Sequence, residues 1–135
     1  MSLHVRRGDY ASDPNASAVH GLCSLDYYAA AVAHIGRFVP RPRYFVFSDD
    51  PTWASEHLKL PGDTVIVEHN DGATSYEDLR LMSRCRHHVI ANSSFSWWGA
   101  WLNPRADKIV VAPSRWLAET TRACPDICPT SWVRL

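Results

Sequence analysis

The sequence lacks a long apolar stretch and carries no net charge. Lysine plus arginine and aspartate plus glutamate each number 14 among its 135 residues, so the formal charge is zero. A neutral chain lacks the bulk attraction to nucleic acid or to an anionic membrane that basic proteins have, so no nucleic-acid partner is expected. No apolar run reaches the roughly 20 residues that cross a bilayer, and no charged segment leads into an apolar one as in a signal peptide. These absences predict a cytoplasmic or peripherally membrane-associated protein.

Familiar nucleotide and metal motifs are missing as well. The sequence contains neither the phosphate-binding loop with its lysine nor the glycine pattern G-x-G-x-x-G, so a nucleotide site here would differ from both types. Asp49 and Asp50 are adjacent carboxylates, but no ligand beside them completes a coordination set, and no metal or other cofactor is expected. Of the four cysteines only Cys124 and Cys128 are close, at a spacing that fits no zinc ribbon. A disulfide between them is one alternative, and reduced thiols are the favoured interpretation.

The chain does contain a regular alternation of strand and helix patterns. Hydrophobic residues make up 46% of it, which is enough for one globular domain over residues 1–135. Turn-forming residues at 10–21 indicate a loop, and prolines near the C-terminus indicate a short helix followed by a tail. Strands are predicted at residues 3–5, 44–47, 64–67, 89–91 and 109–112, with helices after Ser24, after Asp50, from Ser75 and after Ser94. This alternation predicts an α/β fold with a parallel sheet and helices on both faces.

The spacing of apolar residues also predicts which helix faces pack against the sheet. In the last helix, Phe95, Trp98 and Leu102 are expected to face inward and Trp97 outward. The two histidines at residues 87–88 begin a strand without further ligands nearby and are interpreted as structural. The other residues expected in the core are Leu25, Tyr28, Val32, Ile35, Leu79 and Met82.

Two adjacent arginines, Arg6 and Arg7, follow the first predicted strand. A guanidinium forms two charge-assisted hydrogen bonds to phosphate, so the pair suits a diphosphate. Neighbouring residues of an extended segment point to opposite sides, so one arginine is expected to face the ligand and the other to brace a carboxylate such as Asp9. The alternative is a pair of solvated surface arginines, and the flanking His4 and Gly8 favour the binding interpretation.

Further polar residues follow other predicted strands, where ligands of parallel sheets bind. Asn92, Ser93, Ser94 and Ser96 form a turn from strand to helix whose backbone N–H groups suit an anion. Ordinary helix capping by serine is an equally weighted alternative. Asp49 is expected to steady a ribose or an arginine.

Asp78 lies in the first turn of the third predicted helix. An ionised carboxylate can accept two hydrogen bonds from guanine, one from N1–H and one from the exocyclic amine. From the residues alone, a capping-box contact with Ser75 is the favoured alternative.

Four segments resemble, in order and spacing, the motifs of the α-1,2-fucosyltransferases of glycosyltransferase family 11, and the similarity covers residues 3–116. They are residues 4–10 (HVRRGDY), 47–50 (FSDD), 78–85 (DLRLMSRC) and 90–102 (IANSSFSWWGAWL). The resemblance implies a Rossmann-like sheet that forms the C-terminal, donor-binding domain of a GT-B glycosyltransferase. It also implies GDP-L-fucose as the donor, inversion at the anomeric carbon, transfer to the 2-hydroxyl of a galactose-terminated glycan, and no need for a metal.

The resemblance further implies roles for individual residues. Arg6 contacts the β-phosphate and is the catalytic residue, while His4 lies beside the nucleotide. Arg7 and Asp9 support the end of the strand. Asp78 reads the guanine edge, which replaces the capping interpretation.

By the same resemblance, the hydroxyls of residues 93–96 cover the phosphates. Family members carry an acceptor-side domain before the first motif, where this chain has only residues 1–3, so that domain is expected to be absent. The face that its absence exposes would suit a homodimer. A non-catalytic guanine-nucleotide-binding module and a flavodoxin-like signalling or redox domain are the alternative interpretations.

Overall fold

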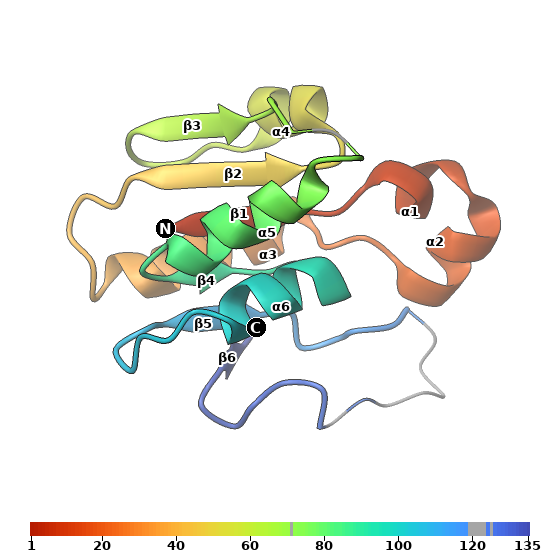
Figure 1. The fold of residues 1–135 in the computed structure, drawn as a ribbon. Helices are drawn as coiled ribbons and strands as arrows, with labels where there is room; N and C mark the ends of the chain where they lie inside the picture. Colours follow the sequence, from red (N-terminus) through yellow and green to blue (C-terminus); the bar gives the residue numbers. More distant parts are fainter. Residues whose placement is uncertain (71, 119–123, 125) are drawn as a thin grey trace.

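One sheet of parallel strands organises the residues that this computed structural model describes, which are 1–70, 72–118, 124 and 126–135. Its strands there are β1 (Ser2–Val5), β2 (Tyr44–Ser48), β3 (Thr64–Val67), β4 (His88–Val89), β5 (Val110–Ala112) and β6 (Val133–Arg134). Their order across the sheet is β3-β2-β1-β4-β5-β6, and every neighbouring pair is parallel (Figure 1). This is the order of doubly wound Rossmann sheets, so the predicted α/β Rossmann-like fold is confirmed.

Helices cover both faces of the sheet, as predicted (Figure 1). Helices α5 and α6 lie on one face, and α3 and α4 lie on the other, while the short α1 and α2 follow β1. The helices are α1 (Gly8–Ser12), α2 (Pro14–His20), α3 (Leu25–Gly36), α4 (Pro51–His57), α5 (Ser75–Arg84) and α6 (Ser94–Trp101). None of those in the described residues is long and apolar enough to cross a membrane.

Alternate residues of the strands supply the two apolar layers. Leu3 of β1 packs in one cluster with Ile35 of α3, whereas Phe47 of β2 packs in another with Met82 of α5. Successive side chains of a strand point to opposite faces, so a short apolar strand serves both layers. The apolar run at residues 44–47 follows this pattern, as its sequence predicts for a strand covered on both sides.

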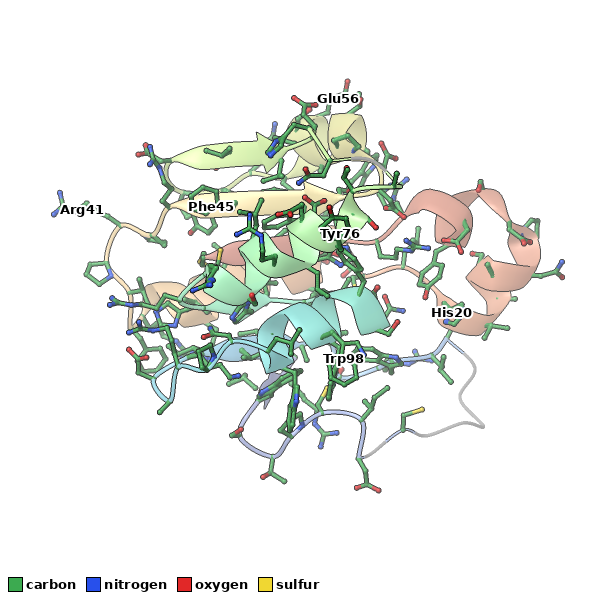
Figure 2. All side chains as sticks on the ribbon, in the orientation of Figure 1. His20, Arg41, Phe45, Glu56, Tyr76 and Trp98 are labelled. Atoms are coloured by element: carbon green, nitrogen blue, oxygen red, sulfur yellow. The ribbon has the colours of Figure 1, made fainter. Side chains whose placement is uncertain are left out.

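The orientation of α6 reverses part of the prediction. Trp98, labelled in Figure 2, and Leu102 are 49% and 52% exposed instead of buried. Trp97, expected to face outward, is half-buried, and its indole N–H donates to the carbonyl of Ile127 at 2.7 Å. Leu25, at the start of α3, is exposed as well, whereas the other predicted core residues of the helices are buried or half-buried.

The close approach of α6 to α5 explains this reversal. A Cβ added at Gly99 would lie 2.9 Å from the Cβ of Met82, so the helices nearly touch there. The buried residues of α6 are accordingly small, namely Ser96, Gly99 and Ala100. A large side chain has no room at this contact, and Trp98 and Leu102 lie outside it.

Residues 10–21 are mostly helical, so the predicted loop is wrong. Asp13 caps α2 by accepting a hydrogen bond from the backbone N–H of Asn15 at 2.8 Å, and Pro14 takes the first helical position. Gly21 ends the helix with a φ of 67°, a conformation that favours glycine. The turn-forming residues of this segment therefore mark the ends of a helix.

The C-terminal end adds a strand to the sheet where a tail was expected, because β6 pairs with β5. Residues 119–123 and 125, which belong to the stretch where a short helix is predicted, lie outside the described residues. Cys128 is a free thiol, so the alternative of a disulfide to Cys124 is not realised.

His88 has the structural role that the sequence predicts. Its buried ring lies between Ser2 Oγ, 2.8 Å from Nδ1, and Asn103 Nδ2, 2.8 Å from Nε2. Because the amide nitrogen of Asn103 can only donate, Nε2 accepts and the Nδ1–H donates to the hydroxyl. Burial, with a smaller effect from the charge of Lys108, lowers the pKa of His88 to about 3. A neutral imidazole thus ties β1 to β4 and to the end of α6.

Gly99→Ala is expected to lower the free energy of unfolding by about 1–3 kcal/mol, because the added methyl group overpacks the contact between α5 and α6. Gly36→Ala is the matched control, since a Cβ there meets nothing within 4 Å. Alanine is the better helix former, so this variant should be equally or more stable than the wild type. Urea denaturation measures both, and equal stability of the two variants would contradict the close approach.

Candidate functional site

A cavity of about 490 Å³ opens at the carboxyl ends of β1, β2 and β3, beside the first turn of α5. Four residues singled out from the sequence line it together: His4, Arg6, Asp49 and Asp78. They meet here, although they are far apart in the chain, because parallel strands end at one edge of the sheet. Within the described residues, no group of three or more His, Cys, Asp or Glu side chains is placed to hold a metal ion.

Two carboxylates hold the guanidinium of Arg6 in the wall of this cavity. Its Nη2 lies 2.7 Å from Asp9 Oδ1, and its Nη1 lies 3.2 Å from Asp49 Oδ2. The guanidinium also lies over the ring of Tyr10, 5.2 Å from the ring centroid. The Nε atom is buried and makes no hydrogen bond with the described residues. Arg6 is therefore fixed in position while it keeps an unsatisfied donor.

Arg7 turns to the other side of the strand end. Its guanidinium lies 3.9 Å from the ring centroid of Trp53, and its Nε lies 3.4 Å from Asp50 Oδ2. Asp50 also caps α4, as predicted, by accepting from the backbone N–H of Trp53 at 3.1 Å. The two arginines thus divide as expected: Arg7 braces a carboxylate, that of Asp50, while Arg6 lines the cavity and also pairs with Asp9.

Asp49 links the ends of two strands. It accepts a hydrogen bond from the backbone N–H of Arg7 at 2.8 Å and pairs with Arg6 through its second oxygen. Gly8 packs directly against this carboxylate, and a Cβ at that position would collide with Oδ2. The glycine after the arginine pair thus allows the close approach of Asp49. Of the two roles expected for Asp49, the structure shows the one that steadies an arginine.

His4 is an uncharged polar group in the cavity wall. It is 5% exposed, and its ring centroid lies 5.7 Å from that of Phe95. Burial, reinforced by the nearby charge of Arg6, lowers the pKa of His4 to about 3. Its Nδ1 atom is buried without a hydrogen-bond partner in the described residues. A buried polar atom of this kind usually has a partner, so His4 has an unused hydrogen-bonding position beside the cavity.

Asp78 is bonded to a residue that the sequence analysis did not single out. Its Oδ1 accepts a hydrogen bond from Nδ2 of Asn70 at 2.6 Å, and both residues line the cavity. The N-cap of α5 is Thr74, which makes Glu77 the third helical residue, so the expected capping box between Ser75 and Asp78 is not formed. The position of Asn70 just beyond the third strand, where parallel sheets bind ligands, is the signal that could have identified it.

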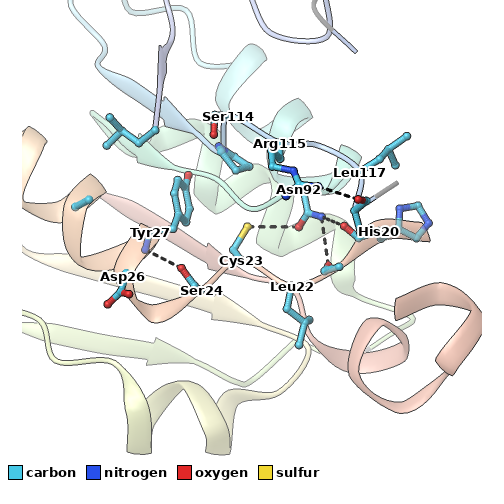
Figure 3. A pocket seen from close by; sticks show the side chains of 15 residues that line it. His20, Leu22, Cys23, Ser24, Asp26, Tyr27, Asn92, Ser114, Arg115 and Leu117 are labelled. Carbon is cyan, nitrogen blue, oxygen red and sulfur yellow. Dashed lines mark hydrogen bonds between the residues drawn. The ribbon is translucent and has the colours of Figure 1, made fainter. Parts of the chain in front are cut away.

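Asn92 lies outside this cavity and bonds to the backbone. Its Nδ2 donates to the carbonyl of His20 at 2.8 Å, and its Oδ1 accepts from Cys23 Sγ at 3.4 Å (Figure 3). The same Nδ2 also donates to the carbonyl of Trp116 at 3.2 Å. It lines a larger cavity, of about 670 Å³, beside the start of α3. The Asn92 amide therefore joins three segments of the chain.

The serines of the predicted anion turn lie at the start of α6. Ser93 is the N-cap residue, but its side chain makes no capping hydrogen bond. Ser96 is buried, and its hydroxyl donates to the carbonyl of Ser93 at 3.3 Å. Ser94 is exposed, and the next residue, Phe95, lines the cavity. The first N–H groups of α6 thus lie close to the cavity, and phosphate binding by this turn stays a prediction.

Comparison with known proteins agrees with the motifs and with the sheet. Residues 1–135 match the sequence model of Glycosyl transferase family 11. The chain belongs to this family. The membership confirms the resemblance drawn from the four motifs.

The relatives of this glycosyltransferase family 11 chain include two from Escherichia coli. The O-antigen biosynthesis glycosyltransferase WbnK is 41% identical over 134 residues, which are 99% of this chain and 44% of the relative. An alpha-1,2-colitosyltransferase is 39% identical over 136 residues, 100% of this chain and 47% of the relative. The human galactoside alpha-(1,2)-fucosyltransferase 1 is 25% identical over 103 residues, 76% of this chain and 28% of the relative. The chain thus spans less than half the length of these relatives, and no solved structure gives a significant match.

Acid should destabilise the fold through His4 and His88. The pKa of each is about 3 in the folded chain, against 6.5 for an unperturbed histidine. Their stabilising effect is therefore fully present above pH 6.5 and is lost as the pH falls below it, because only the unfolded chain then binds the protons. Between about pH 7.5 and about pH 5, each should lower the free energy of unfolding by about 2 kcal/mol.

His4→Gln removes one of these two groups, so its loss of stability over that range should be smaller than that of the wild type by about 2 kcal/mol. Urea denaturation at the two pH values measures the difference. An equal loss in both proteins would contradict a neutral, buried His4.

Proposed function

We propose that this chain is the donor-binding half of an inverting, metal-independent α-1,2-fucosyltransferase of the GT-B type. Its cavity holds the GDP of GDP-L-fucose, and fucose passes to the 2-hydroxyl of a galactose-terminated glycan. The observation that carries the proposal is that Arg6 and Asp78 line one cavity. A guanidinium suits a diphosphate, and a carboxylate suits the N1–H and amino group of guanine.

Arg6 acts on the leaving group. The acceptor hydroxyl gives its proton to a general base as its oxygen attacks the anomeric carbon. The bond from that carbon to GDP breaks, and negative charge grows on the β-phosphate. A fixed cation stabilises this charge without reorganising during the reaction, which is commonly the largest catalytic contribution. The ion pairs with Asp9 and Asp49 supply that fixed position.

Two buried nitrogen atoms support a polar ligand in this cavity. Nδ1 of His4 and Nε of Arg6 are both buried without partners in the described residues, and both side chains line the cavity. Unsatisfied buried polar atoms are costly and rare in folded proteins. A bound nucleotide diphosphate offers many acceptor oxygens and would satisfy the Arg6 donor, and His4 can then pair with the nucleotide beside it.

Colitose is a second candidate for the transferred sugar. The relative that is 39% identical over the length of this chain is named an alpha-1,2-colitosyltransferase, while the human relative named for fucose is 25% identical. The same diphosphate and base contacts serve either donor. Competition between the two activated sugars in the complete enzyme would identify the preferred one.

Arg6→Ala is expected to weaken GDP binding to the chain by about 10- to 100-fold, as the loss of charge-assisted hydrogen bonds implies. Binding of GMP should weaken less, because GMP lacks the β-phosphate. In the complete enzyme, turnover should fall at least about 100-fold. Calorimetry and a transfer assay measure these effects.

Arg43→Ala is the matched control, since Arg43 is exposed and pairs only loosely with Asp63 at 3.8 Å. It should leave both GDP affinity and turnover near the wild-type values. GDP affinity and turnover that survive the loss of Arg6 would overturn its assignment to the phosphate.

A further inference from the structure

We infer that Asn70 is a positioning residue, which holds the Asp78 carboxylate in the orientation that accepts guanine. The preference for a base that carries a 2-amino group therefore depends on Asn70. This inference rests on the proposed function. It gives Asn70 a role in base recognition that neither the sequence motifs nor the membership of the family assigns to it.

The contact is short and joins two separate elements. Nδ2 of Asn70 lies 2.6 Å from Oδ1 of Asp78, and the two residues are eight positions apart in the sequence. Asn70 follows β3, whereas Asp78 belongs to the first turn of α5, and both line the cavity. The hydrogen bond therefore fixes the helix-borne carboxylate relative to the edge of the sheet.

The chemistry of the pair fits a donor-rich base edge. A carboxylate has about four acceptor positions, so one bond from Asn70 is compatible with two more from guanine. The two hydrogen bonds from guanine must be nearly parallel, because its N1–H and its amino group lie side by side. A carboxylate held in one rotamer meets this requirement without paying the conformational entropy of becoming ordered on binding.

A helix-capping function does not account for the contact. The N-cap of α5 is Thr74, and Asp78 lies beyond the capping-box position, so the contact with Asn70 is not part of a capping box. Replacing the amide of Asn70 by a carboxylate would place two like charges within hydrogen-bond distance. The position thus requires a donor if Asp78 is to keep its orientation.

The test compares three nucleotides in the 135-residue chain. GDP, inosine diphosphate and GMP are titrated by calorimetry, because inosine diphosphate keeps N1–H and lacks the 2-amino group, while GMP lacks the second phosphate. In Asn70→Ala, the preference for GDP over inosine diphosphate should fall about 3- to 10-fold, the range expected when a preset side chain becomes free. The preference for GDP over GMP should stay unchanged. Asn70→Asp should lose at least as much base preference.

Asn15→Ala is the matched control, since Asn15 is exposed on α2, and it should bind all three nucleotides as the wild type does. Asn70→Ala should also have no further effect on base preference in an Asp78→Asn background, because it acts through that carboxylate. Thermal unfolding establishes that the variants are folded.

Each remaining outcome has a distinct meaning. A full preference for GDP over inosine diphosphate in Asn70→Ala overturns the inference. Equal weakening of all three nucleotides also overturns it, because it shows a purely structural contact. A wild-type chain that binds GDP and inosine diphosphate equally, or binds neither, overturns the proposed base site itself.

Discussion

The carboxylate of Asp49 joins the end of β1 to the end of β2, and the geometry of the site depends on this link. One oxygen accepts the backbone N–H of Arg7, and the other pairs with the side chain of Arg6. The chain is thereby held where it leaves the sheet, with successive guanidiniums on opposite sides. Gly8 makes the link possible because any larger residue would displace the carboxylate. The segment at residues 6–9 thus depends for its geometry on Asp49, which lies 42 positions from Arg7 in the sequence.

The opposite wall of the cavity depends on helix packing. Small residues of α6 allow it to pack closely against Met82 of α5. Asp78 and Phe95 reach the cavity from these two helices. A substitution at this helix contact would therefore move Asp78, the residue proposed to read the base, although it does not touch that side chain.

Local patterns in the sequence predicted the parts of the structure that local chemistry decides. The apolar runs gave the first strands, Asp50 and Pro51 gave the start of α4, and strand-helix alternation gave the parallel sheet. The orientations of Trp97 and Trp98 were not predicted correctly. The close approach of α6 to α5, and not the spacing of apolar residues, determines which face of α6 is buried. The two-residue β6 is too short to have a period, and the bond of Asn70 to Asp78 exists only once α5 is in place.

Asn92 shows that residues of one sequence motif can have different roles in the structure. Its amide fastens the end of α2 and the segment after β5 to the sheet, while Phe95 of the same motif lines the cavity at the ends of β1, β2 and β3. If Arg6 acts on the leaving group as proposed, substitutions at positions 92 and 6 would both abolish activity. The first would act by loosening the chain segments that Asn92 joins, and the second by removing a charge that stabilises the phosphate. The yield of folded protein, and not the catalytic rate, distinguishes variants at position 92 from variants at position 6.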